Sequence, residues 1–262
     1  MTVSYSKLSR YINNPARAYA HYVLKDKTAY PIDNQEALVY GRILHDKMAD
    51  EEIKLSEEEM KIAYKYGNEE RGLKASFESL DDVYVSLLEN VHNLYKKLKG
   101  EKNTAVTGKN EVSFENELFN GRYDFVDYKN HIIVDWKTVS PRIDFDKAWS
   151  DRDGTYTSWI HSTMYDVQAF IYLYSIIQET GFNDWKYYVI AASKSYQPKT
   201  RVIDMGGVMN NFELRDLIDN TLQDIDDYET GKKQPPILND KSDWYETHKP
   251  FEVELYWWLM YM

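Results

Sequence analysis

The sequence predicts an α/β or α+β domain in which helices flank a small mixed β-sheet and a mainly helical region comes first. Three observations predict it. Helix signals dominate residues 1–100, the alternation typical of strands begins near Gly108, and a strongly patterned helix at 166–179 is followed by another strand pattern. The expected order is therefore helices, then β-β-β-α-β, then a final helix.

Four helices are expected before residue 105, and each carries a start or stop signal. Asn14 followed by Pro15 is typical of a helix N-terminus, and Ser56 with Glu59 forms a capping-box pattern. Gly100 follows a periodic segment and marks its end. The four helices should cover 15–24, 35–52, a segment that opens after Ser56, and 80–99.

The strands of the sheet are expected after Gly108. They should cover 110–115, 121–127 and 132–137, with the last two joined through Lys129 and Asn130. The stretch 140–159 is rich in aromatic residues and should be irregular. The remaining elements should be a helix at 166–179, strands at 185–192 and 201–204, and a helix at 212–228; the apolar tail at 251–262 is not assigned.

The chain length favours one domain, because 262 residues can enclose a sizeable core and no linker or repeat divides them. Within it we expect a mainly helical region at 1–105 that carries His45, a catalytic core at 106–205, and a C-terminal helix and tail at 206–262. No apolar run is long enough to span a membrane, and no secretory signal is visible, so we expect a cytoplasmic protein.

Composition excludes some functions and weakens others. The sequence has no cysteine, which excludes disulfides, thiolate zinc sites and cysteine-ligated iron–sulfur clusters. The net charge of −11 counts against a protein that coats nucleic acid passively, but less against an enzyme with a local basic groove. Aromatic residues make up 15% of the chain; most should pack in the core, and some could line a surface that stacks bases.

Two carboxylates should face each other across the second hairpin. If the hairpin is symmetric about Lys129 and Asn130, Asp124 lies directly opposite Asp135, with Cβ atoms about 4.5–5.5 Å apart. Lys137 shares a face with Asp135, because side chains alternate along a strand. Opposed like charges destabilise a pair of strands, so they need compensation, and a divalent cation such as Mg²⁺ or Mn²⁺ provides it.

This set suits phosphodiester hydrolysis, which needs an activated water and a stabiliser for developing negative charge. A metal held by Asp124 and Asp135 could supply both, and Lys137 could orient the water or neutralise the transition state. The alternative is that the two aspartates are strand-end residues and the lysine an ordinary surface cation. Asp-x-Lys alone favours that alternative; the ordered combination with the preceding hairpin favours a site.

The segments 121–124 and 132–138, Gly-Arg-Tyr-Asp and Ile-Ile-Val-Asp-Trp-Lys-Thr, resemble the G-x-x-D … D-x-K-T core of RecB-like members of the PD-(D/E)XK nuclease superfamily. Further segments match the same branch in order along the chain. They are the N-terminal Ser-x-Ser-x-Leu at 4–8 with Asn14-Pro15, the Gly-x-x-x-His at 41–45, Glu111 on the first core strand, and the Gln-x-x-x-Tyr at 168–172.

The resemblance implies a restriction-endonuclease-like core and a metal-dependent DNA nuclease, and within the superfamily it is best to RecE-like, phage-type recombination exonucleases. It implies Asp124, Asp135, Lys137, Gln168 and Tyr172 as catalytic residues. It also implies DNA as substrate, a single-strand annealing protein as a possible partner, and a possible homo-oligomer. Two positions depart from the pattern: Tyr123 replaces the proline of the superfamily name, and Asn14 replaces the cysteine that helps to hold an iron–sulfur cluster in some relatives.

The accessory residues each have a simpler interpretation. The resemblance implies His45 and Glu111 as metal ligands beside Asp124 and Asp135, but a helix histidine or a strand glutamate is often structural. Gln168 and Tyr172 share a helix face and are expected beside the site and outside the deep core. Asp127 should point to the opposite face and is a reserve candidate. A late cluster of basic residues could contact the DNA backbone or simply be solvated: Lys194, Lys199 and Arg201.

Three functional hypotheses follow. The first is a DNA exonuclease of phage-type recombination or repair, in a bacterial or phage-infected cell. The second is a structure-specific or CRISPR-adaptation-type endonuclease of the same superfamily. The third is a catalytically inactive nuclease fold that serves as a binding module, against which the intact Asp124, Asp135 and Lys137 argue.

Overall fold

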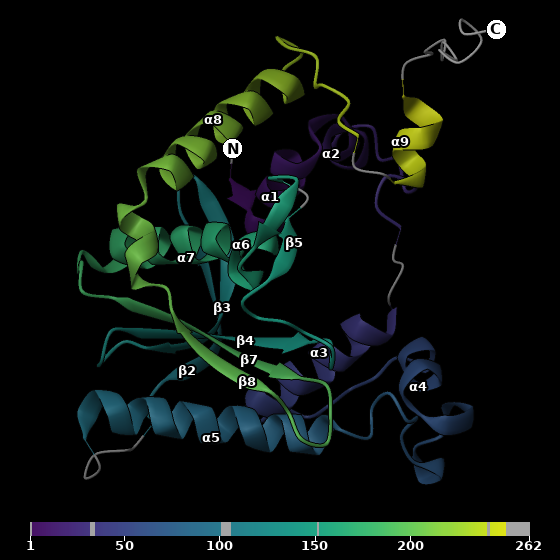
Figure 1. Ribbon diagram of the computed structural model, residues 1–262, viewed down its shortest axis with the longest axis vertical. Coiled ribbons are helices and arrows are strands. Elements are labelled where there is room, and N and C mark those ends of the chain that lie inside the picture. Colours follow the sequence, from purple (N-terminus) through teal and green to yellow (C-terminus); the bar gives the residue numbers. More distant parts are fainter. Residues whose placement is uncertain (1, 32–34, 101–105, 151, 240–241, 250–262) are drawn as a thin grey trace, which may run out of the picture.

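A mixed β-sheet forms the centre of the computed structural model, which describes residues 2–31, 35–100, 106–150, 152–239 and 242–249. The strand order is β1-β3-β4-β7-β8, and β2 pairs with β3 beside that path (Figure 1). The strands of this sheet are β1 (Val3–Ser4), β2 (Lys109–Glu115), β3 (Phe119–Asp127), β4 (Ile132–Val139), β7 (Lys186–Ser193) and β8 (Thr200–Asp204). This confirms the expected small mixed sheet with flanking helices.

The direction of each strand follows from its connection. Short turns make β2, β3 and β4 antiparallel neighbours, whereas β4 and β7 run parallel because the helix α7 (Tyr165–Thr180) crosses between them. The β3–β4 hairpin pairs Asp127 with Ile132 and Phe125 with Val134. The register predicted from the sequence is therefore confirmed for residues 125–127, and the pairing does not extend to Asp124 and Asp135.

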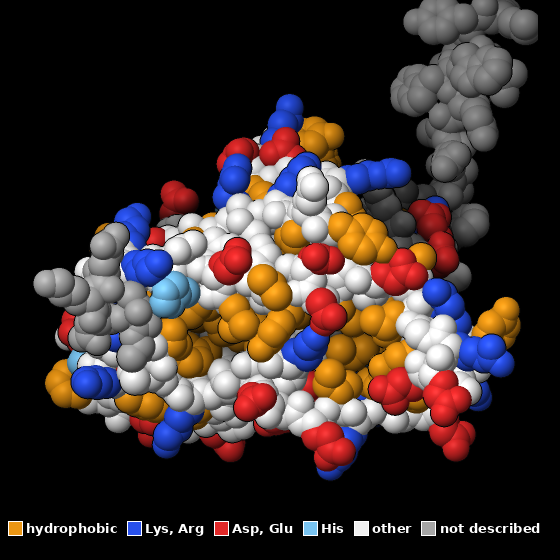
Figure 2. Space-filling view, turned by 90° about the horizontal axis from the view of Figure 1, so that it is seen from below, with side chains coloured by type: hydrophobic (Ala, Val, Ile, Leu, Met, Phe, Trp, Pro, Cys, Tyr) orange, Lys and Arg blue, Asp and Glu red, His pale blue; other side chains and the backbone are white. Residues whose placement is uncertain are grey.

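Helices cover both faces of the sheet. The helices α3 (Gln35–Met48), α4 (Glu57–Ala63) and α5 (Leu80–Lys99) share a core with the face that carries Val134 and Trp136. The helices α1 (Tyr5–Asn13), α6 (Trp159–Ser162), α7 and α8 (Phe212–Glu229) share the other core, on the face that carries Ile133. Figure 1 shows these two layers below and above the sheet, and Figure 2 views the lower layer from outside, where apolar side chains lie among charged ones.

Smaller elements complete the fold. The helices α2 (Pro15–Tyr22) and α9 (Asp243–His248) contact each other in a third cluster that contains Ala16, Ala20 and Trp244. Three 3-10 segments are η1 (Lys65–Gly67), η2 (Glu69–Arg71) and η3 (Gly206–Asn210). Of the helices in the described ranges, none is both long and apolar enough to cross a membrane.

The predicted helix starts agree with the structure. The side chain of Asn14 accepts a hydrogen bond from Arg17 N at 3.2 Å, directly before Pro15 opens α2. Ser56 and Glu59 exchange the two bonds of a capping box, of 3.3 and 2.8 Å. The helix α5 covers the predicted range 80–99, whereas α3 ends at Met48, four residues before the expected end at 52.

Several short elements were not expected from the sequence. Ser4 caps the unexpected helix α1, and α9 follows α8 near the C-terminal end. The stretch 140–159 is not irregular throughout, because it contains the hairpin of β5 (Ala148–Ser150) and β6 (Thr155–Thr157). The tail at 251–262 lies outside the described residues, and the division of the chain into regions within one domain stays a prediction.

Candidate active site

The sheet opens at the level of Asp124. Pairing between β3 and β4 reaches Phe125 but not Asp124, and pairing between β2 and β3 is interrupted between Asn110 and Val112. The residue at this interruption is Glu111, whose φ of 53° lies in the left-handed region. That conformation is rare for a residue other than glycine and is often found at functional sites. Glu111, Asp124 and Asp135 thus occupy one level across three adjacent strands.

Asp124 is held by the neighbouring strand. Its Oδ2 accepts a hydrogen bond from the backbone N–H of Trp136 at 2.8 Å, and its Oδ1 lies 3.6 Å from Nδ1 of His45. Burial, and next the charge of Asp135, raise the pKa of Asp124 to about 7. Asp124 in this environment therefore binds a proton more readily than a free aspartate does.

Asp135 is almost fully buried and faces groups of the protein through both oxygens. Nζ of Lys137 lies 2.6 Å from its Oδ2, and Nε2 of Gln168 donates to its Oδ1 at 3.0 Å. Burial alone would lower the pKa of Lys137, but the charge of Asp135 and the neighbouring Tyr165 raise it. Lys137 is therefore a charged ammonium that is paired with Asp135. Its Nζ also lies 4.8 Å from the ring centroid of Tyr165.

One imidazole and two carboxylates converge beside this pair. Potential ligand atoms of His45, Glu111 and Asp124 all lie within 4.8 Å of one another. Burial would lower the pKa of His45, but the hydrogen bond to Glu111 and the charge of Asp124 raise it. Carboxylates suit Mg²⁺ and Mn²⁺, and an imidazole ligand is more typical of transition metals, so this donor set fits a divalent cation. The sequence analysis also proposed Asp135 as a ligand; its oxygens face Lys137 and Gln168 in the structure, and a ligand role for Asp135 stays a prediction.

Gln168 and Tyr172 lie deeper than we expected. Both are buried on α7, and Gln168 reaches Asp135 instead of solvent. The ring of Tyr172 packs edge-on against Phe114 and Tyr123, with centroids 5.2 and 5.4 Å away. Burial, followed by the charge of Asp135, raises the pKa of Tyr172 to about 12. The placement of these two residues outside the deep core was wrong, because α7 lies directly on the sheet beneath the site.

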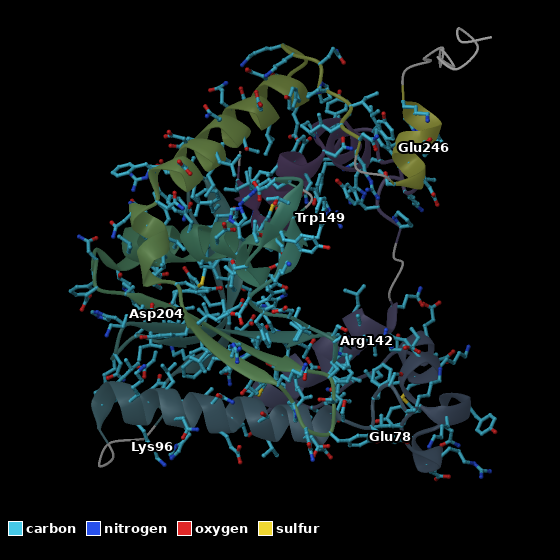
Figure 3. The ribbon with its side chains drawn as sticks, viewed as in Figure 1. Glu78, Lys96, Arg142, Trp149, Asp204 and Glu246 are labelled. Atoms are coloured by element: carbon cyan, nitrogen blue, oxygen red, sulfur yellow. The ribbon has the colours of Figure 1, made fainter. Side chains whose placement is uncertain are left out.

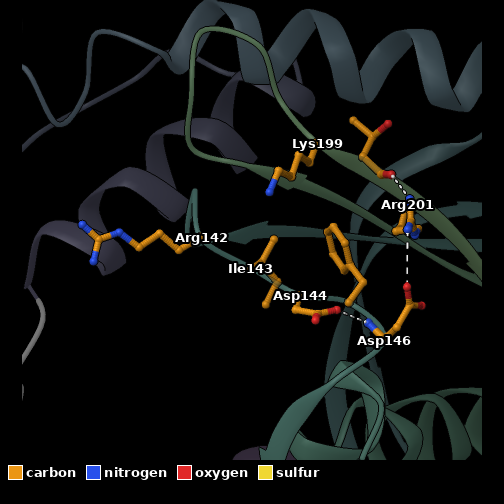
Figure 4. A pocket seen from close by; sticks show the side chains of 8 residues that line it. Arg142, Ile143, Asp144, Asp146, Lys199 and Arg201 are labelled. Carbon is orange, nitrogen blue, oxygen red and sulfur yellow. Dashed lines mark hydrogen bonds and ion pairs between the residues drawn. The ribbon is translucent and has the colours of Figure 1, made fainter.

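The three basic residues proposed to contact DNA do not form one cluster. Nζ of Lys194 lies 5.3 Å from the ring centroid of Tyr40 on α3, and burial lowers the pKa of this lysine. Lys199 and Arg201 instead line an open pocket against residues 142–146, where Arg201 lies 3.7 Å from Asp146 (Figure 4). We expected the three residues together because they are close along the chain. They follow β7, precede β8 or lie on β8, and their side chains contact different parts of the protein.

The contacts of Asp127, the reserve candidate, indicate a structural role. It is buried at the end of β3, and its carboxylate accepts hydrogen bonds from Tyr95, at 2.7 Å, and from both the backbone and the side chain of Asn130. Burial acts to raise the pKa of Asp127, but these hydrogen bonds outweigh it and hold the pKa below its usual value. The residue fixes the turn that sets the hairpin register.

Sequence reasoning missed two neighbours of the site. Nε of Arg122 lies 2.6 Å from Oε2 of Glu111, and Tyr165 contacts Lys137 as described above. Arg122 precedes Asp124 by two residues, so the period of a strand already placed both on one face. For Tyr165 the sequence offered no comparable signal, because its contact depends on how α7 crosses the sheet.

The chain belongs to a family whose model describes a PDDEXK-like domain of unknown function, DUF3799, and matches residues 4–242. The resemblance to the PD-(D/E)XK superfamily is thereby confirmed. Among curated proteins, none matches the chain.

Two solved structures are similar in fold. A presumed exonuclease from Eubacterium rectale has a TM-score of 0.70 and 16% sequence identity, and the match covers 99% of this chain and 92% of that one. A phage-related exonuclease from Haemophilus somnus 129PT has a TM-score of 0.39 and 14% identity, with 88% and 95% covered. At these identities the first likeness shows a common fold, and the second is too distant to support an argument.

Proposed function

We propose that this protein is a metal-dependent DNA exonuclease that hydrolyses phosphodiester bonds. The observation that carries the proposal is the convergence of His45, Glu111 and Asp124 beside the buried pair of Asp135 and Lys137. The chain belongs to the PDDEXK-like family, and these side chains lie where the pairing of β3 with β4 ends. The arrangement combines a cation site with a fixed positive charge, which is what hydrolysis of a phosphodiester needs.

Each side chain of the site has a distinct task in this proposal. His45, Glu111 and Asp124 would hold a divalent cation, which would lower the pKa of water and polarise the scissile phosphate. Lys137 donates hydrogen bonds to the attacking water or the phosphate and balances the charge that develops there. Asp135 holds the ammonium of Lys137, and Gln168 orients the carboxylate of Asp135 by its hydrogen bond.

The basic pocket between β8 and the segment 142–146 is a proposed contact for the DNA backbone. Arg142, Lys199 and Arg201 line it with Asp144 and Asp146, and Arg201 is already paired with Asp146 (Figure 4). Lys199 and Arg142 are therefore better candidates for phosphate contacts than Arg201. Lys194 does not line this pocket. Its ammonium lies over Tyr40 of α3, so it would contact DNA only where the DNA passes α3.

The resemblance to RecE-like exonucleases supplies the expected setting. On this basis we propose a role in phage-type recombination or repair, with Mg²⁺ or Mn²⁺ as cofactor and a single-strand annealing protein as partner. A ring-shaped homo-oligomer would confine a DNA end and make cleavage processive.

The test is digestion of end-labelled linear duplex and closed circular DNA, each with Mg²⁺, Mn²⁺ or Ca²⁺. We expect linear duplex to be degraded with Mg²⁺ or Mn²⁺ while closed circles survive, and we expect Lys137→Met to be inactive. Equal cutting of circles would support the endonuclease alternative. DNA binding without any hydrolysis would support an inactive binding module.

A further inference from the structure

The hairpin of β5 and β6 exposes two large aromatic side chains on its outer face. Trp149 and Tyr156 are directly paired across the two strands and are 46% and 61% exposed. Their ring centroids lie 5.4 Å apart with an interplanar angle of 80°. Figure 3 labels Trp149 on the hairpin, above the sheet.

The exposure of these rings is not explained by the packing of the hairpin. The inner face carries the small residues Ala148, which packs against the main core, and Ser150, which is fully buried. A half-buried hairpin normally has its apolar side chains inward and polar ones outward. Here the largest apolar groups of the hairpin point outward, and exposed aromatic area of this kind often marks a binding surface.

The hairpin is firmly attached to the helices beside the candidate active site. At its turn, Asp153 accepts from Ser150 at 2.6 Å and pairs with His161 at 2.8 Å, and His161 pairs in turn with Asp166 of α7 at 2.9 Å. These polar contacts join the hairpin to α7, the helix that carries Gln168.

At its open end, a chain of ring contacts connects the hairpin to Lys137. The ring of Phe145 lies 5.3 Å from that of Trp159, and Trp159 lies 5.1 Å from Tyr165. Tyr165 is the ring that contacts the ammonium of Lys137.

A cation accompanies the two rings. Nζ of Lys147 lies 5.0 Å from the ring centroid of Tyr156. The protein as a whole carries a net charge of −11, so long-range attraction to phosphates is weak and a local contact must supply affinity. Aromatic rings with a neighbouring cation are the combination that binds single-stranded nucleic acid, because every unpaired base offers a π-face and every nucleotide a phosphate.

We propose that Trp149, Tyr156 and Lys147 form a stacking site for unpaired nucleobases of a single DNA strand. This inference rests on the proposed nuclease function for its biological meaning. The site holds the strand that leads to or leaves the catalytic centre, whereas paired bases inside a duplex cannot present their faces to it. Because stacking depends on the face of the base and not on its edge, the site binds all four bases.

The test measures affinity without cleavage. A fluorescein-labelled dT12 strand is titrated with protein in EDTA and followed by anisotropy, beside a matched strand in which the bases are replaced by abasic sites. Removing one ring, in Trp149→Ala or Tyr156→Ala, should weaken dT12 binding by about 5- to 150-fold and leave the affinity for the abasic strand unchanged. Tyr156→Phe should bind as the parent does, since it keeps the ring.

The matched control is Tyr66→Ala, which removes a tyrosine that is 93% exposed on the 3-10 segment η1, outside the hairpin. It should leave dT12 affinity unchanged. The parent should also bind dT12 more tightly than the abasic strand, a comparison that needs no variant.

Equal affinity of the parent for the two strands, or parental dT12 affinity in both alanine variants, would overturn the proposal. So would a change of oligomeric state in these variants without loss of dT12 affinity, which would assign the rings to a protein interface. If the parent binds dT12 as predicted but degrades no DNA with any metal, the stacking site stands and the nuclease proposal fails.

Discussion

Replacement of Asp124 by asparagine should stabilise the protein in EDTA, although it removes a candidate metal ligand. Burial and the charge of Asp135 raise the pKa of Asp124 from the usual 3.8 to about 7. A difference of about three pKa units corresponds to a free energy of about 4 kcal/mol by which the ionised carboxylate destabilises the folded state. Asparagine has nearly the same shape, can still accept the hydrogen bond from Trp136, and carries no charge.

The pH dependence of this effect has a definite sign. Asp124 ionises near pH 3.8 in the unfolded chain and near pH 7 in the folded protein, so between these values the folded state binds more protons. The contribution of Asp124 to the free energy of unfolding therefore falls as the pH rises through this window and is lowest above pH 7. The advantage of Asp124→Asn should be about 4 kcal/mol at pH 8 and less than half of that at pH 5.

Thermal unfolding in EDTA at pH 8 and pH 5 measures this difference. A change of about 4 kcal/mol in a protein of this size shifts Tm on the order of 10 °C. The matched control is Asp127→Asn in the same strand, where hydrogen bonds from Tyr95 and Asn130 hold the pKa below its usual value despite burial. That variant should lower Tm at pH 8. A Tm of Asp124→Asn equal to or below that of the parent at pH 8, or a gain that does not depend on pH, would refute the reasoning.

Other consequences of the site can be tested with the same protein. Mn²⁺ should raise the Tm of the parent by binding the folded state, should raise that of Asp124→Asn much less, and should still raise that of Lys137→Ala, because Lys137 is not a ligand. His45→Ala should increase the metal concentration needed for half-maximal hydrolysis, and an unchanged titration would leave His45 a structural residue. Gln168→Ala should lower kcat without unfolding the protein, since it frees the carboxylate that holds Lys137; parental kcat would contradict this. Tyr172→Phe should lower kcat while Tm stays within a few degrees of the parent, because it keeps the buried ring but removes the hydroxyl that hydrogen-bonds Gln168; a large loss of Tm with normal turnover would show that the hydroxyl serves stability only.

Much of the sheet could be predicted because its signals are local. The register of the β3–β4 hairpin follows from a short symmetric turn, and Asp127 accepts hydrogen bonds from Lys129 and Asn130 that fix this turn. The start of α2 follows in the same way from Asn14 and Pro15. Each of these features depends on residues within a few positions of one another.

The features that the sequence did not reveal depend on distant residues. The β5–β6 hairpin has strands of three residues each, too short for an alternating pattern, and it is held by His161 and Asp166 from the following helices. The burial of Tyr172 depends on contacts with Phe114 and Tyr123, about fifty residues earlier in the chain. Lys194 and Lys199 are close in sequence, but the turn between β7 and β8 separates their surroundings.

Groups of the protein compensate part of the negative charge of the opposed carboxylates, in addition to the metal that the sequence analysis proposed. Asp135 is balanced by the ammonium of Lys137 and the amide of Gln168, which leaves Asp124 as the carboxylate whose charge is least compensated. The backbone N–H of Trp136 offsets this only in part, because one neutral donor is weaker than a buried charge. Asp124 also lies where His45 and Glu111 converge. The least compensated charge of the pair thus belongs to the proposed ligand group, and we expect a bound cation to relieve the destabilisation that the ionised Asp124 causes in the absence of metal.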